Sequence, residues 1–304
     1  MRSPPPDVLP QMGDNGGVRA LRRSKTVRIG AVLLVLSLVA VLVIVARNAV
    51  RYREAVALDE AGDAQGAYQI FHALGGYADA AQRAQALVEA DPALPYRSAS
   101  KGDTVSFGSY EQDGNTQNGP EPIQWIVLDK IDGQLLLLSA DVLAARQYHH
   151  VPFEEVTWEN SDLRAWMNGD FYDGAFTTVE RGLIETVHNE NADQSITGAS
   201  GGAATDDRVF ALSETESVIY LNTPAARSDI GAAPASVHAA AGPLSVSEDG
   251  TADWWLRSPG TYGFATQFVD ASGTPSLSGA NVDLQYGVRP ALWLNVEGAG
   301  EGSR

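Results

Sequence analysis

The longest apolar run of the chain is Ile29–Ala46, in which Ser37 is the single polar side chain. As an α-helix rising about 1.5 Å per residue, this run reaches about 27 Å, which is enough to cross a thin hydrocarbon layer. A cleaved signal peptide is the alternative, but the apolar region of such peptides has about 7–15 residues and precedes a small-residue cleavage site. No such site occurs before "RNAVRYR". We therefore predict an uncleaved transmembrane helix that contacts membrane lipid through residues 29–46.

Basic residues flank this run more heavily on its N-terminal side. Those before and after it are Arg19, Arg22, Arg23, Lys25 and Arg28, then Arg47, Arg51 and Arg53. The positive-inside bias predicts a single-pass protein of the cell membrane with a cytoplasmic N-terminus and an extracytoplasmic C-terminal domain. Residues 1–28 are predicted to be a disordered basic tail in the cytoplasm, and residues 297–304 a second disordered tail.

Apolar residues recur at helical spacing over residues 47–92, with breaks at "AGDA" and "LGGYAD". The blocks "GDAQGAYQIF" and "LGGYADA" resemble tetratricopeptide-like repeats. Only about one and a half units are present, whereas stacked repeats need about three to bury a continuous core. A helical neck that packs on itself or on the next domain is the favoured interpretation. A peptide-binding groove is the alternative, although a groove needs more stacked repeats.

The pattern from residue 98 to residue 296 is mixed and non-repeating. "DTVSFGSY" alternates and predicts a strand, while the apolar runs 123–128 and 135–138 around "DKIDG" predict a hairpin with a fully covered second strand. "RVFALS", "WWLRS", "TQFVDASG" and "GVRPALWLNV" predict further strands. Pro290 cannot donate a ladder hydrogen bond, so the last strand should have an edge, a bulge or a break there.

Capping signals predict three helices in the same portion. Ser161 is placed to cap "DLRAWMNGDFY". Thr177 with Glu180, and Ser213 with Glu216, have capping-box spacing before "RGLIETVH" and "SVIYL". The Ala-, Gly-, Pro- and Ser-rich residues 222–253 predict a loop with a helical turn at 235–241. Together, these elements predict an α+β domain.

The strand "DWWLRSPG" has two adjacent tryptophans. Successive strand side chains point to opposite faces, so Trp254 and Trp255 cannot both be in a core unless the strand is covered on both sides. Two core tryptophans are the favoured interpretation, because aromatic rings supply much of a core's apolar area. Ligand binding by one of them is the alternative.

Composition excludes several classes of function. The chain contains no cysteine, so disulfides, thiolate metal sites and thiol nucleophiles are excluded. Residues 1–53 hold nine of the 21 basic residues and two of the 38 acidic residues, which gives a charge of +7. Residues 54–304 hold the other 12 basic and 36 acidic residues, which gives −24. Nucleic acid is excluded as a partner, because its binding depends on basic residues that neutralise phosphates.

Six motifs resemble one widespread bacterial domain family of uncharacterised function, over residues 102–296. In order they are "GDTVSFGSYEQDGN", "EPIQWIVLD", "VTWENSDLRAWMNGDFY", "RVFALS", "WWLRSPG" and "GVRPALWLNV". More weakly, "WWLRSPG" and "GVRPALWL" resemble closing strands of the C-type-lectin-like fold of formylglycine-generating enzymes. This resemblance implies a C-type-lectin-like mixed domain over residues 98–296, with short antiparallel strands and flanking helices. Those enzymes depend on a cysteine pair, so their oxidase activity is not expected here.

The lectin-like analogy implies a ligand surface on the loops after Pro259 and around Asn281. The predicted ligand contacts are Trp254, Tyr262, Phe264, Gln267, Asn281 and Tyr286. Trp255, Arg257 and Arg289 are predicted to be structural, because guanidinium groups favour carboxylates and an acidic domain offers many.

No catalytic residue, metal site or cofactor is predicted. Adjacent residues such as His149 and His150 rarely direct both rings at one ion, and the remaining histidines lack ligand spacing. "EQDGNTQNG" lacks the pattern of a calcium loop, and "WEN" directly precedes a helix that it is expected to cap. "GASGGAAT" lacks the lysine of a phosphate loop and is predicted to be a flexible loop.

These features predict a membrane-anchored extracytoplasmic protein whose domain binds a cell-wall polymer or a protein ligand without catalysis. The first alternative is an envelope-acting hydrolase or transferase that uses paired carboxylates such as Asp270 or Asp283. A cleft holding two carboxylates about 5–10 Å apart would favour it. The second alternative is a structural or sensory partner of another membrane protein, with the neck making the contact.

Overall fold

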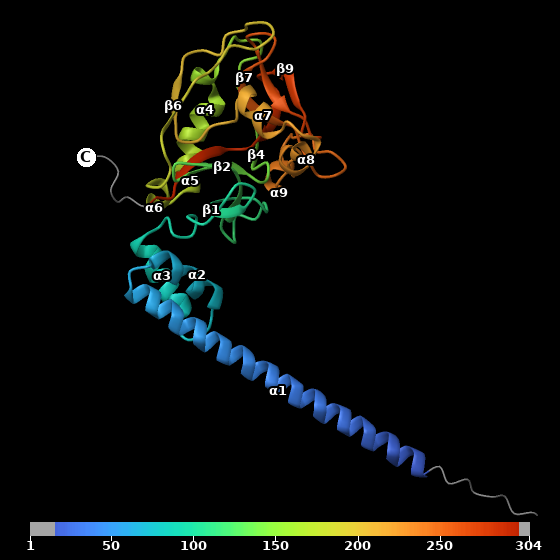
Figure 1. Cartoon of the computed structure of the whole chain (residues 1–304). Coiled ribbons are helices and arrows are strands. Elements are labelled where there is room, and N and C mark those ends of the chain that lie inside the picture. Colours follow the sequence, from blue (N-terminus) through green and yellow to red (C-terminus); the bar gives the residue numbers. More distant parts are fainter. Residues whose placement is uncertain (1–15, 298–304) are drawn as a thin grey trace, which may run out of the picture. The chain divides into compact units, whose positions relative to one another are not determined.

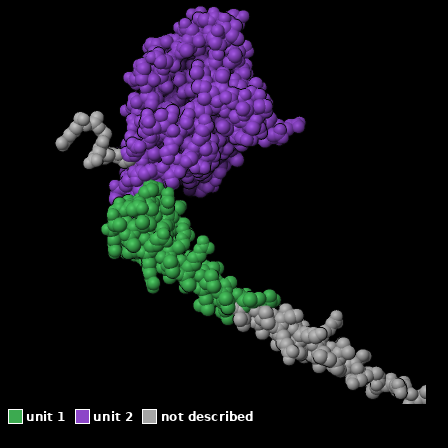
Figure 2. Space-filling model, viewed as in Figure 1, with its two compact units in different colours: residues 1–85 green, residues 86–304 purple. Residues whose placement is uncertain are grey.

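A computed structural model describes residues 16–297, with the side chains of residue 33 and of residues 36–297. The chain forms two compact units, residues 1–85 and 86–304 (Figures 1 and 2). The predicted tails lie outside the described residues at 1–15 and 298–304. Residues 16–28, for which a disordered tail was predicted, are helical.

The first unit contains the helix α1 (Gly16–Glu60), the helix α2 (Ala64–Leu74) and the start of α3 (Ala80–Ala90). The two breaks between these helices fall where "AGDA" and "LGGYAD" predict them. Phe71 of α2 is fully buried and its ring lies edge-on to Tyr52 of α1, with ring centroids 5.7 Å apart. The neck therefore has a small apolar contact of its own between α1 and α2.

Within the described residues, no helix is both long enough and apolar enough to cross a membrane. The predicted span at residues 29–46 includes residues 29–32, 34 and 35, whose side chains lie outside the described residues. Membrane anchoring therefore stays a prediction.

The second unit contains a sheet of four antiparallel strands in the order β1–β2–β3–β11. Their bounds are Thr104–Tyr110, Glu121–Ile131, Gln134–Ser139 and Ala291–Asn295. The hairpin predicted around "DKIDG" is β2–β3, and Asp132 and Gly133 at its turn have φ of 47° and 71°, as a type I′ turn requires. Residues 135–138 of β3 are fully buried, so the strand is covered on both faces as predicted.

A second sheet has the order β4–β10–β7–β8–β9, antiparallel except for the pair β10–β7 (Figure 1). The bounds are β4 Ala144–Gln147, β7 Trp254–Pro259, β8 Ala265–Val269, β9 Pro275–Asn281 and β10 Gln285–Val288. Every residue of β7 is buried, so the strand with the two tryptophans is covered on both faces.

The predicted strand "GVRPALWLNV" is divided between the two sheets. β10 ends at Val288 and β11 begins at Ala291, so the chain changes sheets at Arg289 and Pro290. The break predicted at Pro290 is confirmed, because this residue has no N–H with which to continue the ladder.

A two-stranded sheet pairs β5 (Val187–Asn189) with β6 (Thr205–Asp207). Two predictions are wrong in this region. The helix predicted through Val187 is the short α6 (Thr178–Arg181), which ends at Gly182. "RVFALS" is not a regular strand, because its backbone groups bond to separate elements: Phe210 bridges to Ala291, and Leu212 accepts from the Arg257 N–H.

Short helices cover the sheets. They are η1 (Trp158–Asn160), α4 (Asp162–Trp166), η2 (Met167–Phe171), α5 (Tyr172–Ala175), α7 (Glu214–Tyr220), α8 (Pro224–Ala226), η3 (Arg227–Gly231) and α9 (Val237–Ala240). Ser161, Thr177 and Ser213 cap α4, α6 and α7, which confirms the three capping predictions. The predicted loop 222–253 carries α8, η3 and α9, and α9 lies at the predicted helical turn. The second unit is therefore an α+β domain.

Candidate functional site

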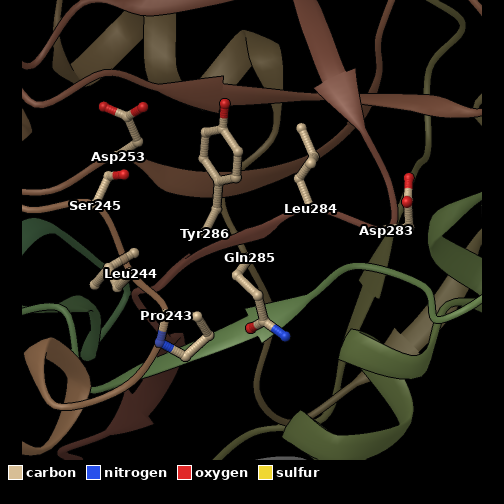
Figure 3. Close-up of a pocket in the computed structure, with 8 residues that line it drawn as sticks. All are labelled: Pro243, Leu244, Ser245, Asp253, Asp283, Leu284, Gln285 and Tyr286. Atoms are coloured by element: carbon tan, nitrogen blue, oxygen red, sulfur yellow. The ribbon is translucent and has the colours of Figure 1, made fainter.

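A cavity of about 460 Å³ opens beside β10, which pairs with both β4 and β7. Its lining comes from the loop after α9, the residue before β7, and the turn and first residues of β10. The lining residues are Pro243, Leu244, Ser245, Asp253, Asp283, Leu284, Gln285 and Tyr286 (Figure 3). Two carboxylates face this space, and the lining contains no lysine or arginine.

Gly287 allows β10 to lie close against the residue before β7. A Cβ at this position would lie 2.7 Å from the Asp253 carbonyl oxygen and 2.6 Å from Val142 Cγ1, which real side chains do not tolerate. The Gly287 N–H instead donates to the Asp253 carbonyl over 2.8 Å. This close approach places Asp253 beside Tyr286.

Two acceptors in the lining are buried and have no hydrogen-bond partner within the described residues: Asp283 Oδ1 and Gln285 Oε1. A buried acceptor without a partner costs about 1–3 kcal/mol, so most buried polar atoms in native proteins are paired. Gln147 Nε2 donates to the Asp283 carbonyl over 2.6 Å, which fixes the backbone here but leaves the carboxylate free. The lining thus holds two acceptor oxygens that no described donor reaches.

Two ionisable side chains of the lining, Asp253 and Tyr286, have shifted pKa values. Burial raises the pKa of Asp253, an effect opposed by the hydrogen bond from the Ala271 N–H and reinforced by the charge of Asp270. Burial also raises the pKa of Tyr286, and the negative charge of Asp253 adds to the effect. In Figure 3 the Tyr286 ring stands between Asp253 on one side and Leu284 and Asp283 on the other.

Tyr286, a predicted ligand contact, thus lines the cavity. Its ring packs at a tilt against Trp255 and Phe268, with centroids 4.3 and 4.8 Å apart and planes at 31° and 58°, and these two rings hold it in place. Trp255 is buried and donates from Nε1 to the Arg146 carbonyl over 2.8 Å, so it supports the Tyr286 ring from below the surface.

Trp254 does not lie on a ligand surface, which corrects that prediction. The side chain is fully buried, its Nε1 donates to the Gly231 carbonyl over 2.8 Å, and the Arg289 guanidinium lies 4.8 Å from its ring. Strand alternation directs it to the face opposite Trp255, and short helices cover that face. Both faces of its ring are thereby occupied by protein.

Gln267 is also fully buried and is not a surface contact. Its Nε2 donates to Glu214 Oε2 over 2.6 Å and to the Pro259 carbonyl over 3.0 Å. The sequence could not show this partner, because Glu214 is 53 residues away. Gln267 links β8 to the first turn of α7.

Arg257 and Arg289 find different kinds of partner. Arg257 Nη1 pairs with Glu216 Oε2 over 2.5 Å, the carboxylate partner that the sequence predicts. Arg289 donates instead to backbone carbonyls: Nη2 to Ser139 over 2.6 Å and Nη1 to Ile230 over 2.6 Å. The carboxylate prediction for Arg289 is therefore wrong.

A second cavity, of about 530 Å³, lies beside α7. Three of its four carboxylates accept a hydrogen bond: Glu214 from Gln267, Glu216 from Arg257 and Asp193 from the Gly201 N–H. Arg257 lines this space and leaves its Nε without a partner. Since most of its carboxylates already accept hydrogen bonds from the protein, this cavity is a weaker candidate for a ligand than the cavity beside β10.

The remaining predicted contacts lie at a separate place. Tyr262 and Phe264 stack nearly parallel, with centroids 5.3 Å apart, and Phe153 lies edge-on to Phe264. Tyr262 and Phe153 are exposed, by 60% and 67%. Asn281 pairs with Ala265 at the end of β9, next to this cluster. The structure thus divides the predicted contacts between an aromatic surface and the cavity of Tyr286.

Comparison with known families supplies the classification. The profile of DUF6273, described as a domain of unknown function, matches residues 132–296, which is more than half of the chain. The chain belongs to the DUF6273 family. No curated protein and no solved structure matches it significantly.

The match begins at Asp132, within the β2–β3 hairpin. The DUF6273 region therefore contains the cavity beside β10 and the aromatic surface, whereas "GDTVSFGSYEQDGN" and "EPIQWIVLD" precede it. These two segments form β1 and β2, which complete the four-stranded sheet around the start of the DUF6273 region.

Sequence reasoning missed Asp253, Gln285 and Phe153. A signal for Gln285 was present, since it stands directly before Tyr286, a predicted ligand contact. Asp253 and Phe153 gave no signal, because the loops that bring them to β10 and to Phe264 are set by tertiary contacts.

Proposed function

We propose that the chain is a single-pass membrane protein whose extracytoplasmic DUF6273 domain binds an amine-bearing component of the envelope without chemical conversion. The observation that carries this proposal is the pair of buried, unpartnered acceptors, Asp283 Oδ1 and Gln285 Oε1, in a cavity without basic residues. An ammonium group offers several donors and a positive charge to such a lining.

Charge supports an amine over a neutral or anionic ligand. Asp253 and Asp283 both line the cavity, and residues 54–304 carry 36 acidic and 12 basic residues. An excess of one charge raises the local concentration of oppositely charged ligands. The Tyr286 ring, held by Trp255, provides a face on which a sugar ring or a cation can rest.

The side chains of α1 support the proposed anchor. The large apolar residues described between residues 33 and 45 are each at least 49% exposed; they are Leu33, Leu36, Leu38, Val39, Val41, Leu42, Val43, Ile44 and Val45. A helix that is apolar on all sides needs an apolar environment. We propose that membrane lipid supplies it, with the N-terminus in the cytoplasm.

The C-type-lectin-like fold and the tetratricopeptide-like neck remain parts of this proposal. The short antiparallel strands with flanking helices are consistent with the former, and the helices α2 and α3 with the latter. In this proposal the neck separates the domain from the membrane. A sensory or structural role for the neck is the alternative.

Anchoring is tested by the variant Leu38→Arg/Leu42→Arg. Each arginine at the centre of a membrane-spanning helix costs about 2.5–3.5 kcal/mol, so the double variant should no longer be retained in membranes washed with carbonate. The wild type should be retained, and protease added to intact cells should remove its C-terminal domain. Release of the wild type by carbonate, or protection of that domain from protease, would overturn the proposed localisation.

Ligand binding is tested with glucosamine oligomers and their fully N-acetylated counterparts, which differ in the charged amine. Full-length protein in detergent should bind the amine form, and Asp283→Asn should weaken binding about 10- to 100-fold, since a hydrogen bond to a charged group contributes about 1.5–3 kcal/mol. Calorimetric titration measures the affinity of the wild type and of Asp283→Asn for each oligomer.

Asp170→Asn is the control, because Asp170 is exposed, lies outside the cavity and loses the same charge. It should bind as the wild type does. Equal affinity for the amine and N-acetyl forms, or equal effects of the two variants, would contradict the proposal.

One observation favours the hydrolase alternative. Asp253, whose pKa is raised, shares the cavity with Asp283, and carboxylates in unlike environments can act as acid and base. Incubation of the same oligomers with the protein distinguishes a hydrolase from a binding protein. Shortening of the oligomers by the wild type, but not by Asp283→Asn, would indicate catalysis.

A further inference from the structure

We propose that His149, His150 and Asp162 form a binding site for a divalent transition-metal ion such as Zn²⁺. One ligand atom from each of these residues lies within 4.8 Å of the other two. Asp162 Oδ2 lies 3.2 Å from His149 Nδ1 and 2.6 Å from His150 Nδ1. Two ligand atoms bound to one tetrahedral ion at about 2.0–2.2 Å lie about 3.3–3.6 Å apart, so the His149–Asp162 pair already has nearly this separation and the His150–Asp162 hydrogen bond would open when the ion binds.

The local backbone explains how two adjacent histidines can face one ion. β4 ends at Gln147 and the chain bends at Tyr148 and His150, so the alternation of strand side chains does not apply. The two imidazole centroids are 4.9 Å apart, with their planes at 52°. The expectation that neighbouring rings diverge holds for a strand, not for this bend.

His149 is buried and directs its Nδ1 toward Asp162. His149 is 8% exposed, and its Nδ1 is buried without a hydrogen-bond partner in the described part of the chain. Its other nitrogen, Nε2, lies 3.5 Å from Glu154 Oε2. A carboxylate near the second ring nitrogen favours the orientation of the ring in which the first nitrogen is a metal ligand.

Both ends of the segment are held in place before any ion binds. The His149 N–H donates to the Val282 carbonyl and the His150 N–H to Asp162 Oδ2, each over 2.9 Å. Phe153 adopts a left-handed φ of 57° and packs edge-on against Phe264. This packing fixes the turn that carries Glu154.

The ligand set determines the class of ion. Two imidazoles with one carboxylate suit Zn²⁺ and similar ions, whereas Ca²⁺ and Mg²⁺ prefer all-oxygen sites. The side chains of His150 and Asp162 are 70% and 48% exposed, so solvent can supply a fourth ligand. Three protein ligands with an open position also allow a ligand group to bind the ion directly. The inference does not depend on the cavity beside β10.

The test is titration of chelator-treated, full-length protein in detergent with Zn²⁺, in competition with a chromogenic chelator. The wild type should bind one ion that His150→Ala does not bind. His149→Ala and Asp162→Asn should weaken binding at least about tenfold, and Glu154→Gln about 10- to 100-fold. Co²⁺ should give visible absorption bands with the wild type and not with His150→Ala.

His188→Ala is the matched control. His188 and Asp206 form a similar exposed pair, with Nδ1 and Oδ1 2.8 Å apart, but no second histidine is described beside them. This variant should bind Zn²⁺ as the wild type does. Because His150 is exposed, His150→Ala should stay folded, which an unchanged urea-unfolding curve verifies. The proposal is overturned if the wild type binds no stoichiometric Zn²⁺, or if His150→Ala binds as tightly as the wild type.

Discussion

Replacing Asp207 with alanine should lower the free energy of unfolding of the DUF6273 domain by about 3–5 kcal/mol, the usual cost of removing one partner of a buried ion pair. The Asp207 side chain is fully buried and accepts from Arg164 Nε over 2.6 Å. It also accepts from Trp158 Nε1, Asn189 Nδ2 and Thr205 Oγ1 over 2.9, 3.0 and 2.7 Å. Alanine would leave all four donors without this acceptor.

This carboxylate also makes stability depend on pH. Burial acts to raise the pKa of Asp207, but the hydrogen bonds from Asn189, Trp158, Thr205 and Arg164 outweigh it, so the pKa is lowered. A carboxyl with a lowered folded pKa contributes stability above its unfolded pKa of about 3.9, and this contribution is lost as pH falls through the folded value. The difference between wild type and Asp207→Ala should therefore shrink below about pH 4.

Urea unfolding followed by tryptophan fluorescence measures the effect, because all six tryptophans lie between residues 125 and 293. Asp206→Ala is the control on the same strand. Asp206 pairs only with the exposed His188 among the described ion pairs, so its loss should cost less than about 1 kcal/mol. Equal effects of the two variants would show that the Asp207 network is not a principal source of stability.

Replacing Arg289 with methionine should destabilise the domain by about 3 kcal/mol or more. The buried guanidinium donates to three backbone carbonyls, those of Ser139, Ala140 and Ile230. Each buried acceptor left without its donor costs about 1–3 kcal/mol. Burial lowers the pKa of Arg289 to about 9, so the group stays charged at neutral pH.

The position of Arg289 explains this expectation. It stands at the break between β10 and β11, and its carbonyl partners lie at the end of β3 and in η3. One side chain thus joins the end of β3 to η3 at the point where the chain passes from one sheet to the other. Arg289→Lys keeps the charge but not the planar arrangement of donors, so it should recover only part of the lost stability.

Thermal unfolding with the same fluorescence signal measures both variants. Arg208→Met serves as the control, because Arg208 is exposed and lies 5.2 Å from the ring of Tyr172. A cation–π contact at an exposed site contributes about 0.5–1 kcal/mol. If Arg289→Lys were as stable as the wild type, charge alone rather than the donor geometry would explain the role of Arg289.

Local signals in the sequence predicted several elements correctly. The hairpin at Asp132 and Gly133, the caps at Ser161, Thr177 and Ser213, and the break at Pro290 all depend on residues close in the chain. The lengths of elements were less predictable: α6 ends at Gly182 because the following residues join β5 and the bridge of Ile184 to Leu294.

The candidate site was predicted only in part. Tyr286 was singled out and does line the cavity, whereas Trp254 and Gln267 are buried by elements that lie far from them in the sequence. Asp253 and the unpartnered Gln285 Oε1 depend on how closely β10 approaches β7, which Gly287 permits and which no local pattern reveals.

The sequence by itself determined the apolar run near the N-terminus, the absence of cysteine, the acidic charge and the local caps and turns, because these depend on composition and on neighbours within a few residues. Only the tertiary structure decided that Arg289 pairs with carbonyls, that Asp162 faces two histidines, and that the predicted contacts lie at two separate places. These facts depend on pairs of residues many positions apart, and their distances are set by the packing of the two sheets.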